Sequence, residues 1–328
     1  MKKVRLFIGF FIIFSVVFTC FYGGKKIHVE KIKNQPESYQ GVLSLWQIDS
    51  FEGGKGSRKQ FLLKASRDFE KSNNGVLIMV VNMTKEGAEE NFNNGIYPDI
   101  ISFGGGVNVQ NASAFDAENT VIGGMVGNKT LATAWCKGGY VLITNPNYKQ
   151  VQGKSTLIVS QTDYTCPLIS LMLKNLSIDE VEVLSPMNAY VKFVSGKSKY
   201  LLGTQRDINR LESRNMDVLT EPLTEFNDLF QYISICATDE LKRYYAEKFI
   251  NYLISENVQN QLKEIGMFSP FYKLEYENEH LASMQSNSKF SCISAFALGE
   301  SIKDLQRLSL LAVKGDEQAK INIKNMLI

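Results

Sequence analysis

The segment GVLSLWQIDSFEGGKGSRKQF, residues 41–61, decides the fold class. It opens with a short apolar run, Val42 to Trp46, which predicts a buried strand. A polar, glycine-rich turn follows it. Ser57 and Gln60 then have the spacing of a helix capping box, which predicts a helix that continues to the break at Asn73. A buried strand that leads through such a turn into a helix is typical of a parallel α/β sheet.

The same alternation continues along the chain. Val76–Val81 predicts a second strand, Glu86–Phe92 a weaker helix, and Pro98–Phe103 a third strand. A second series begins at Ser155 and predicts a second lobe. The remaining expected elements are strands over 138–145, 155–160 and 200–202, and helices around 167–176, 187–194, 239–265 and 300–313.

The charge distribution excludes one class of partner. Residues 1–40 hold seven of the 36 basic residues but only two of the 34 acidic ones, so the rest of the chain has 29 basic and 32 acidic residues. Phosphate backbones are bound by concentrated basic surfaces. We therefore expect no nucleic-acid partner.

The amino terminus is typical of export. Lys2, Lys3 and Arg5 precede an uncharged apolar run, Leu6 to Tyr22, so we interpret residues 1–24 as a signal peptide or membrane anchor and 25–40 as a tether. The run is at the lower edge of what spans a bilayer, so cleavage and retention both fit. Lipidation at Cys20 is a third alternative. The expected location is the extracytoplasmic face of the cell membrane.

The sequence offers little for catalysis. It has only two histidines, His28 in the tether and His280 in a polar stretch, so histidine-based triads have no basis. The cysteines show no metal-ligand spacing, and we expect neither a metal nor a cofactor. A pair of carboxylates stays open as a hydrolase alternative. For Asp49, Asp99 and Asp207, both a capping role and a ligand contact fit.

Candidate ligand contacts lie where predicted strands end, because open α/β sheets bind ligands at the carboxyl ends of their strands. Three such ends combine polar, aromatic and glycine residues. Two further aromatic residues stack on a ligand or fill the core. The candidates are Trp46, Asp49, Ser57 and Arg58 at the first end, Phe103, Gly104 and Gly105 at the second, Thr204, Gln205 and Arg206 at the third, and the aromatic pair Trp135 and Tyr140.

Five segments, taken in order, resemble the extracellular solute-binding proteins of ABC importers, in particular the group related to maltose-binding protein. The likeness covers roughly residues 41–310 and rests on LWQIDSFEGG (45–54), PDIISFG (98–104), GGYVLITN (138–145), LGTQRD (202–207) and AEKFINYLISENVQ (246–259). It implies an α/β, two-lobe type II periplasmic-binding-protein fold with a hinge.

The resemblance also implies a division of the chain. Lobe 1 is expected to be discontinuous, over 41–145 and 237–328, and lobe 2 to cover 146–236. The chain would cross between lobes near Thr144–Tyr148 and again near Tyr232–Thr238. In such proteins the loops that carry Asp49, Ser57 and Arg58, then Phe103 and Gly104, then Thr204, Gln205 and Arg206 reach the ligand.

The implied activity is binding without catalysis. The expected partners are a small solute, carbohydrate-like, the membrane subunits of an ABC transporter, and the membrane through the N-terminal segment, with the protein itself a monomer. This chain has Gln205-Arg206 where the sugar-binding pattern has a tryptophan after the leucine-glycine pair, which weakens the carbohydrate assignment. An orphan receptor for a sensor and an anchored glycoside or ester hydrolase are the alternatives.

Overall fold

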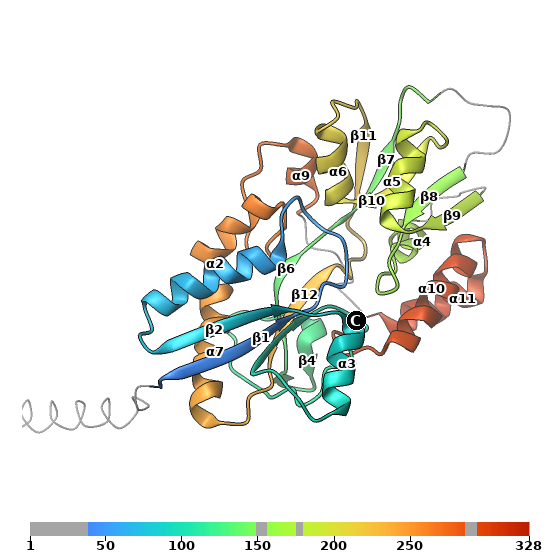
Figure 1. Cartoon of the computed structure of the whole chain (residues 1–328). Coiled ribbons are helices and arrows are strands. Elements are labelled where there is room, and N and C mark those ends of the chain that lie inside the picture. Colours follow the sequence, from blue (N-terminus) through green and yellow to red (C-terminus); the bar gives the residue numbers. More distant parts are fainter. Residues whose placement is uncertain (1–38, 149–155, 175–179, 286–293, 328) are drawn as a thin grey trace, which may run out of the picture. The chain divides into compact units, whose positions relative to one another are not determined.

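A computed structural model describes residues 39–148, 156–174, 180–285 and 294–327, and residues 41–328 form one compact unit (Figure 1). The expected signal or anchor over 1–24 and nearly all of the tether lie outside these ranges. Within them, no helix is both long enough and apolar enough to cross a bilayer.

The first of two five-stranded sheets has the order β2-β1-β3-β12-β6. β1 (Gly41–Gln47) pairs in parallel with β2 (Val76–Asn82) and with β3 (Ile100–Phe103). β12 (Phe230–Ile235) is antiparallel to β3, and β6 (Thr133–Lys137) is antiparallel to β12. The three parallel strands are those that the alternating pattern predicts.

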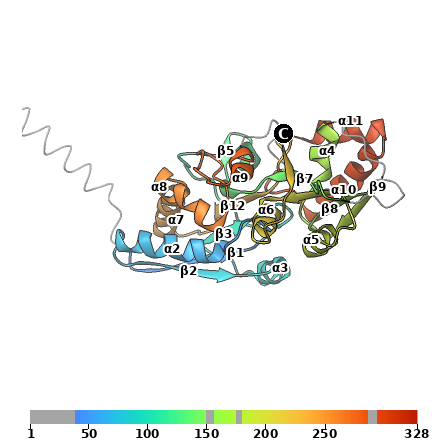
Figure 2. The ribbon, with the colours of Figure 1, turned by 90° about the horizontal axis from the view of Figure 1, so that it is seen from above.

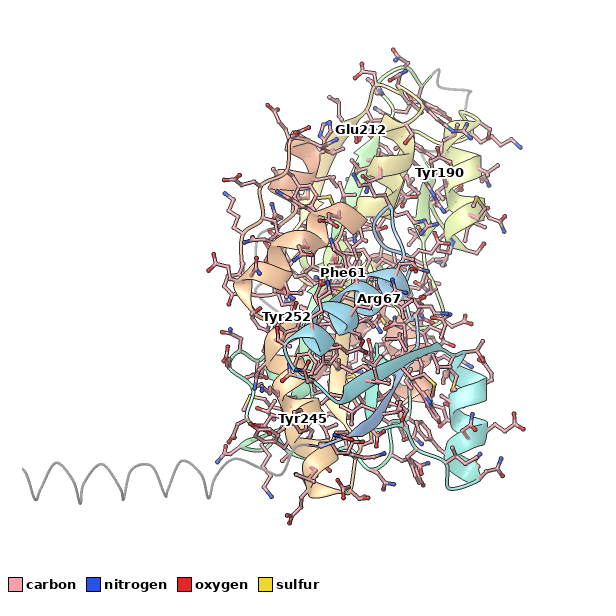
Figure 3. All side chains as sticks on the ribbon, turned by 60° about the vertical axis from the view of Figure 1, so that its left-hand side comes forward. Phe61, Arg67, Tyr190, Glu212, Tyr245 and Tyr252 are labelled. Carbon is pink, nitrogen blue, oxygen red and sulfur yellow. The ribbon has the colours of Figure 1, made fainter. Side chains whose placement is uncertain are left out.

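Two helices lie side by side against this sheet. α2 (Arg58–Lys71) starts where predicted, because the Ser57 hydroxyl accepts the Gln60 backbone N–H, and α7 (Glu240–Leu253) is capped by Asp239. Figure 3 shows Phe61 and Arg67 on α2 next to Tyr245 and Tyr252 on α7. The rings of Phe69 and Phe249 join the helices, with centroids 5.4 Å apart. Burial of these rings fixes the helices on the sheet.

The second sheet repeats the topology of the first. Its order is β11-β7-β10-β8-β9. β8, β9 and β10 are parallel, β7 is antiparallel to β10, and β11 is antiparallel to β7. The two sheets therefore correspond strand for strand, although the sequence shows no fixed-period repeat. The strands are β7 (Tyr140–Thr144), β8 (Thr156–Ser160), β9 (Glu180–Leu184), β10 (Tyr200–Thr204) and β11 (Leu219–Leu223).

Apolar side chains of β7, β8 and β10 form one core with α5 (Pro186–Val194) and α6 (Gln205–Glu212), which include Phe193 and Ile208. The remaining elements are α3 (Lys85–Asn93), α4 (Leu168–Lys174), α8 (Glu256–Gln259), α9 (Glu279–Ser283), α10 (Gly299–Val313), α11 (Glu317–Met326), two short 3₁₀ helices, Ile122–Gly124 and Asn260–Ile265, and the small ladder of β4 (Met125–Val126) and β5 (Lys129–Thr130).

The crossings between sheets differ from the expected ones. β7 was expected in lobe 1, but it pairs in the second sheet, so the chain crosses between Lys137 and Tyr140. β12 was expected at the end of lobe 2, but it pairs in the first sheet, so the return lies between Leu223 and Phe230. Backbone hydrogen bonds join the two crossings, since Gly138 N donates to Leu229 O at 2.7 Å.

The carboxy-terminal region also departs from the expected division, which placed all of 237–328 in lobe 1. α10 and α11 pack beside α4 (Figures 1 and 2). The Gln306 amide of α10 donates to the carbonyls of Thr162 and Thr165, at 3.0 and 2.8 Å. These helices therefore belong with the second sheet.

Candidate functional site

Loops from both sheets enclose one small cavity. Most of the residues that line it lie at or just after the carboxyl ends of β1, β8 and β10, which is where an open α/β sheet places a ligand. Its volume is about 10 Å³, room for about one water molecule. The lining residues are Phe51, Glu52, Tyr140, Ser160, Thr162, Thr165, Pro186, Thr204, Asp207 and Leu229.

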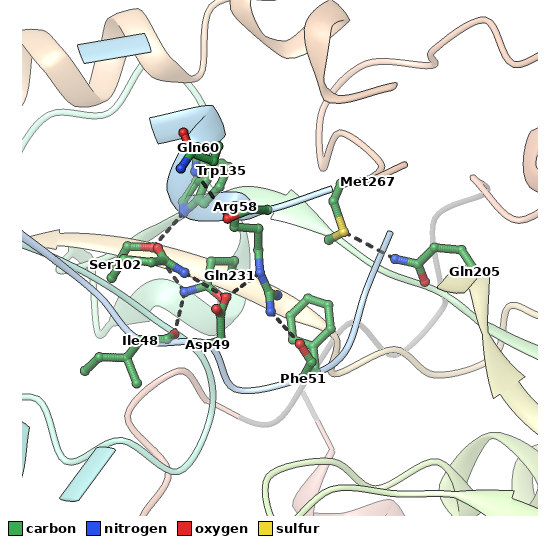
Figure 4. Close-up of polar contacts among 12 residues, drawn as sticks. Ile48, Asp49, Phe51, Arg58, Gln60, Ser102, Trp135, Gln205, Gln231 and Met267 are labelled. Atoms are coloured by element: carbon green, nitrogen blue, oxygen red, sulfur yellow. Dashed lines mark hydrogen bonds and ion pairs between the residues drawn. The ribbon is translucent and has the colours of Figure 1, made fainter. Parts of the chain in front are cut away.

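Arg58 shapes the loop after β1 (Figure 4). Its guanidinium is buried, with Nε 2.7 Å from Asp49 Oδ1 and Nη2 donating to Phe51 O at 2.5 Å. The same group lies over the Phe51 ring, 4.3 Å from the centroid. Charge-assisted hydrogen bonds of this kind are strong, so Arg58 and Asp49 hold the loop in shape. The predicted site residue Ser57 serves as the cap of α2.

Glycine lets the end of β3 approach the same loop. A Cβ on Gly104 would lie 1.7 Å from Ser50 Oγ, so no other residue fits without a shift. Gly105 adjoins Tyr164 O and the Ile302 side chain, both of which belong with the second sheet. The glycine cluster at this strand end thus allows close contact between protein segments.

The start of α6 contains the third group of predicted site residues. Thr204 is the N-cap, and Asp207 completes a capping box by accepting Thr204 N–H at 3.0 Å. Gln205 is completely buried, and its Oε1 accepts Gly139 N–H at 3.0 Å. This side chain therefore anchors the first crossing between the sheets, which lies between Lys137 and Tyr140. Arg206 points elsewhere, with Nε 3.1 Å from Glu52 Oε2. Of the three, Thr204 lines the cavity and Arg206 contacts the opposite loop.

Several contacts join the two lobes directly. Thr162 Oγ1 donates to Ser50 O at 3.2 Å. Glu52 contacts both Arg206 and Arg210, the latter at 3.0 Å. Lys85 Nζ lies over the Tyr164 ring, 5.2 Å from its centroid. Because the lobes touch in this way, the cavity has no room for a sugar-sized solute in the described state.

Three of the predicted aromatic contacts lie in the core. Trp46 stacks on Phe92, and Phe103 is fully buried in the same cluster. Trp135 is fully buried against Phe61, and its indole N–H donates to Ser102 Oγ at 2.9 Å. Because buried rings have no free surface to offer a ligand, we leave all three out of the candidate site. Tyr140 is the predicted aromatic residue that reaches the cavity.

Two carboxylates lie by the cavity, Asp207 buried and Asp228 half-buried, and both serve the fold. Asp228 accepts the Tyr140 hydroxyl at 2.5 Å and the Cys166 N–H at 2.7 Å. Burial raises the pKa of Asp228 to about 6 and that of Asp207, whose hydrogen bond caps α6, also to about 6. With their oxygens committed to the backbone and to Tyr140, these groups lack the open geometry of a hydrolytic pair.

The raised pKa values predict a pH dependence of stability. An aspartate in an unfolded chain titrates near about 3.9, so between that pH and about 6 the folded chain binds more protons than the unfolded one. The resulting stabilisation is complete below about pH 4 and is lost as the pH rises through 6. Asp228→Asn cannot ionise.

We therefore expect the fall in melting temperature between pH 5 and pH 7.5 to be smaller in Asp228→Asn than in the natural sequence, by a few degrees. Differential scanning fluorimetry of both chains over this range measures it. If the melting temperatures of the two chains fell equally between pH 5 and pH 7.5, the assignment of the raised pKa to Asp228 would be wrong.

The other polar candidates have structural partners. Asp99 accepts Ser44 N–H at 2.8 Å and pairs with Lys242 Nζ at 2.9 Å.

Among the described residues, no group of three or more His, Cys, Asp and Glu side chains is placed to hold a metal ion. Cys136, Cys166 and Cys236 are buried free thiols. Cys20 and Cys292 lie outside the described residues.

Sequence reasoning missed five residues that join the lobes or meet at their interface. Glu52 lies in the predicted loop after β1 but was not named as a contact. Arg210 lies one helical turn after Arg206, a spacing visible in the sequence, and both contact Glu52. Thr162 and Tyr164 lie in the polar run that follows the predicted strand 155–160. Polar residues after a strand end are the same signal that identified the three candidate strand ends. Lys85 begins a helix whose position opposite Tyr164 depends on long-range packing.

No family model and no curated protein matches the sequence. Solved structures do match the fold. The sugar-binding protein MalE from Xanthomonas citri has a TM-score of 0.60, is 13% identical, and covers 87% of this chain and 95% of its own. The GacH receptor of Streptomyces glaucescens, solved unliganded and with acarbose, has a TM-score of 0.54 at 13% identity, with 86% and 95% covered.

A third structure has a different ligand. Iron-bound HitA from Pseudomonas aeruginosa has a TM-score of 0.51 at 10% identity, and the match covers 82% of this chain and 99% of that one. The comparisons confirm the expected mixed α/β fold, shared with maltodextrin-binding and other periplasmic solute-binding proteins. At such low identities they leave the ligand open.

Proposed function

We propose that this chain is an extracytoplasmic solute-binding protein. Its two lobes close over a small, hydroxylated solute and deliver it to the membrane subunits of an ABC transporter. The N-terminal segment would hold the protein at the membrane as an anchor, or direct its export as a cleaved signal. The chain would bind its solute without altering it.

One observation carries the proposal: strand ends from two separate sheets, Ser160 and Thr204 from one and the Phe51–Glu52 loop from the other, line a single cavity. Two lobes joined by crossing strands can move about those strands. The hydrogen-bonded pair of crossings, which includes Gly138 and Leu229, is the candidate hinge. The solved structures with this fold include sugar-binding proteins, which supports the same function.

The cavity chemistry supports a hydroxylated solute. Hydroxyl groups of Ser160, Thr162, Thr165 and Thr204 line it, and each both donates and accepts hydrogen bonds. In the described state Thr162 binds Ser50 O across the lobes. A solute would enter when the lobes part, replace such contacts and favour the closed state by touching both lobes at once.

A thermal-shift screen of the full chain in detergent tests the proposal. The solutes are neutral sugars, oligosaccharides, sugar acids, amino acids, peptides and oxyanions, each at millimolar concentration. A ligand at a hundred times its Kd stabilises the folded state by about 2.7 kcal/mol, which corresponds to a rise in melting temperature of about 5 °C or more. We expect such a rise from one chemical class.

The result that would overturn the proposal is a melting temperature unchanged by every class. Recovery of the active solute after long incubation separates binding from hydrolysis. Mass spectrometry should find the solute unaltered, whereas hydrolysis products would favour the anchored hydrolase instead.

A further inference from the structure

Two arginines of the second lobe hold one carboxylate of the first. Arg206 Nε and Arg210 Nη2 lie 3.1 and 3.0 Å from the same atom, Glu52 Oε2. The arginines are four residues apart and so lie on one side of α6. Guanidinium groups bind carboxylates through strong, charge-assisted hydrogen bonds.

Glu52 leaves this pair only partly satisfied. Among the described residues, Arg206 Nε and Arg210 Nη1 are buried atoms with no well-directed hydrogen bond. The 3.6 Å from Arg210 Nη1 to Asp207 Oδ1 is too long for one. A carboxylate free to orient itself would use both of its oxygens, as bidentate arginine pairs do. The arginines therefore have donors to spare for a better-placed anion.

Space for an anion adjoins the arginines. They line an open hollow of about 410 Å³ together with Lys55, Asn209 and Ser213, and a volume of this size suits a small ligand. Glu212 also lines it, so three cationic side chains face one carboxylate there. Glu52 itself lines the small cavity on its other side. The ion pair thus lies between the hydroxyl-lined cavity and the open hollow.

We propose that Arg206 and Arg210 form the anion subsite of the ligand site, and that Glu52 occupies it in the absence of ligand. The solute is then a sugar acid, whose hydroxyl groups face the cavity and whose carboxylate displaces Glu52. This inference rests on the proposed function and specifies the class of solute.

Displacement of Glu52 is energetically easy. The side chains of Glu52 and Arg206 are each 37% exposed, and partly exposed ion pairs contribute little to stability. Glu52 also belongs to the loop between Phe51 and Gly53, outside any helix or strand, so its side chain can turn away without breaking an element. The ion pair between Glu52 and the two arginines therefore joins the lobes when no ligand is bound, and the carboxylate of a ligand can replace Glu52.

Calorimetric titration of the full chain with D-glucuronate and D-galacturonate tests the subsite, with D-glucose, D-galactose and inorganic phosphate as comparison probes. We expect a uronate to bind at least tenfold more tightly than its neutral sugar or phosphate. Glu52→Gln removes the competing carboxylate and should lower the Kd for the uronate about three- to tenfold. Arg206→Gln should raise that Kd at least tenfold.

Arg214 provides the matched control. It follows α6, its guanidinium lies 5.5 Å from the centroid of the Tyr190 ring, and it lines neither the cavity nor the hollow. Arg214→Gln should leave the Kd for the uronate within twofold. Arg206→Gln is preferred to a change at Arg210, because Arg206 is the more exposed of the two. Its loss also leaves the ion pair between Arg210 and Asp207 in place.

Three results would overturn the subsite: a neutral sugar or phosphate that binds as tightly as the uronate, a Kd for the uronate that Glu52→Gln leaves unchanged, or an equal loss in Arg214→Gln. A neutral solute that emerges from the wider screen and binds both chains equally would reject the subsite and leave the proposed function intact. No response to any class would reject the function itself.

Discussion

Gly54→Ala should lower the free energy of unfolding by about 3 kcal/mol or more. The backbone of Gly54 has a φ of +68°, which costs a residue with a side chain about 1–2 kcal/mol. A Cβ there would also lie 2.0 Å from the carbonyl oxygen of Ile265. The loop cannot move aside easily, since Lys55 N–H and Gly56 N–H both donate to that oxygen. Urea unfolding followed by circular dichroism measures the loss.

Gly127→Ala is the control for the backbone conformation. Gly127 has a φ of +59°, but no atom lies within 4 Å of the position its Cβ would take. Its alanine variant should lose only the conformational cost, about 1–2 kcal/mol. Equal losses in the two variants would mean that the contact between the loop after β1 and Ile265 does not form.

Trp135→Ala should lower the free energy of unfolding by about 3–5 kcal/mol, the usual cost of removing a large aromatic side chain from a core. The ring is fully buried and stacks on Phe61 at a centroid distance of 5.6 Å. Its loss leaves a cavity between the first sheet and α2. The measurement is again urea unfolding.

Trp135→Phe separates a core role from a ligand contact. It keeps most of the buried area and gives up the hydrogen bond from the indole to Ser102, which costs about 1 kcal/mol. The Kd for the solute should stay within twofold. A large loss of binding with unchanged stability would return Trp135 to the ligand site.

Local signals made much of the fold predictable. Ser57 and Asp239 each cap a helix where the sequence predicts one to begin, because a cap depends on residues three positions away or fewer. Thr204 caps α6, a helix that was not among the expected elements. Apolar runs predicted β1, β2 and β3 for the same reason. Partners across a sheet are not local. Tyr140–Thr144 was recognised as a strand, but its pairing with β10 and β11 depends on residues about 60–80 positions away.

The candidate site shows the same limit. The loops that carry Asp49 to Arg58 and Thr204 to Arg206 were predicted, since strand ends followed by polar residues are visible in one sequence. The sequence did not predict which side chains of these segments face the cavity. Trp46 and Gln205 point into packed protein, whereas Glu52 faces the arginines of α6. Those orientations follow from how the two sheets pack, which no local pattern encodes.

Closure of two lobes around a solute is the central claim, and a distance between the lobes tests it most directly. Spin labels on Arg67→Cys of α2 and Val191→Cys of α5, both exposed positions, report it. Cys20 and Cys292 are replaced by serine. Pulsed electron paramagnetic resonance on the full chain should show a broad or two-peaked distribution of the distance between the labels, because open and closed states are both populated. A saturating solute should convert it to one peak. The same distribution with and without a solute that raises the melting temperature would contradict lobe closure.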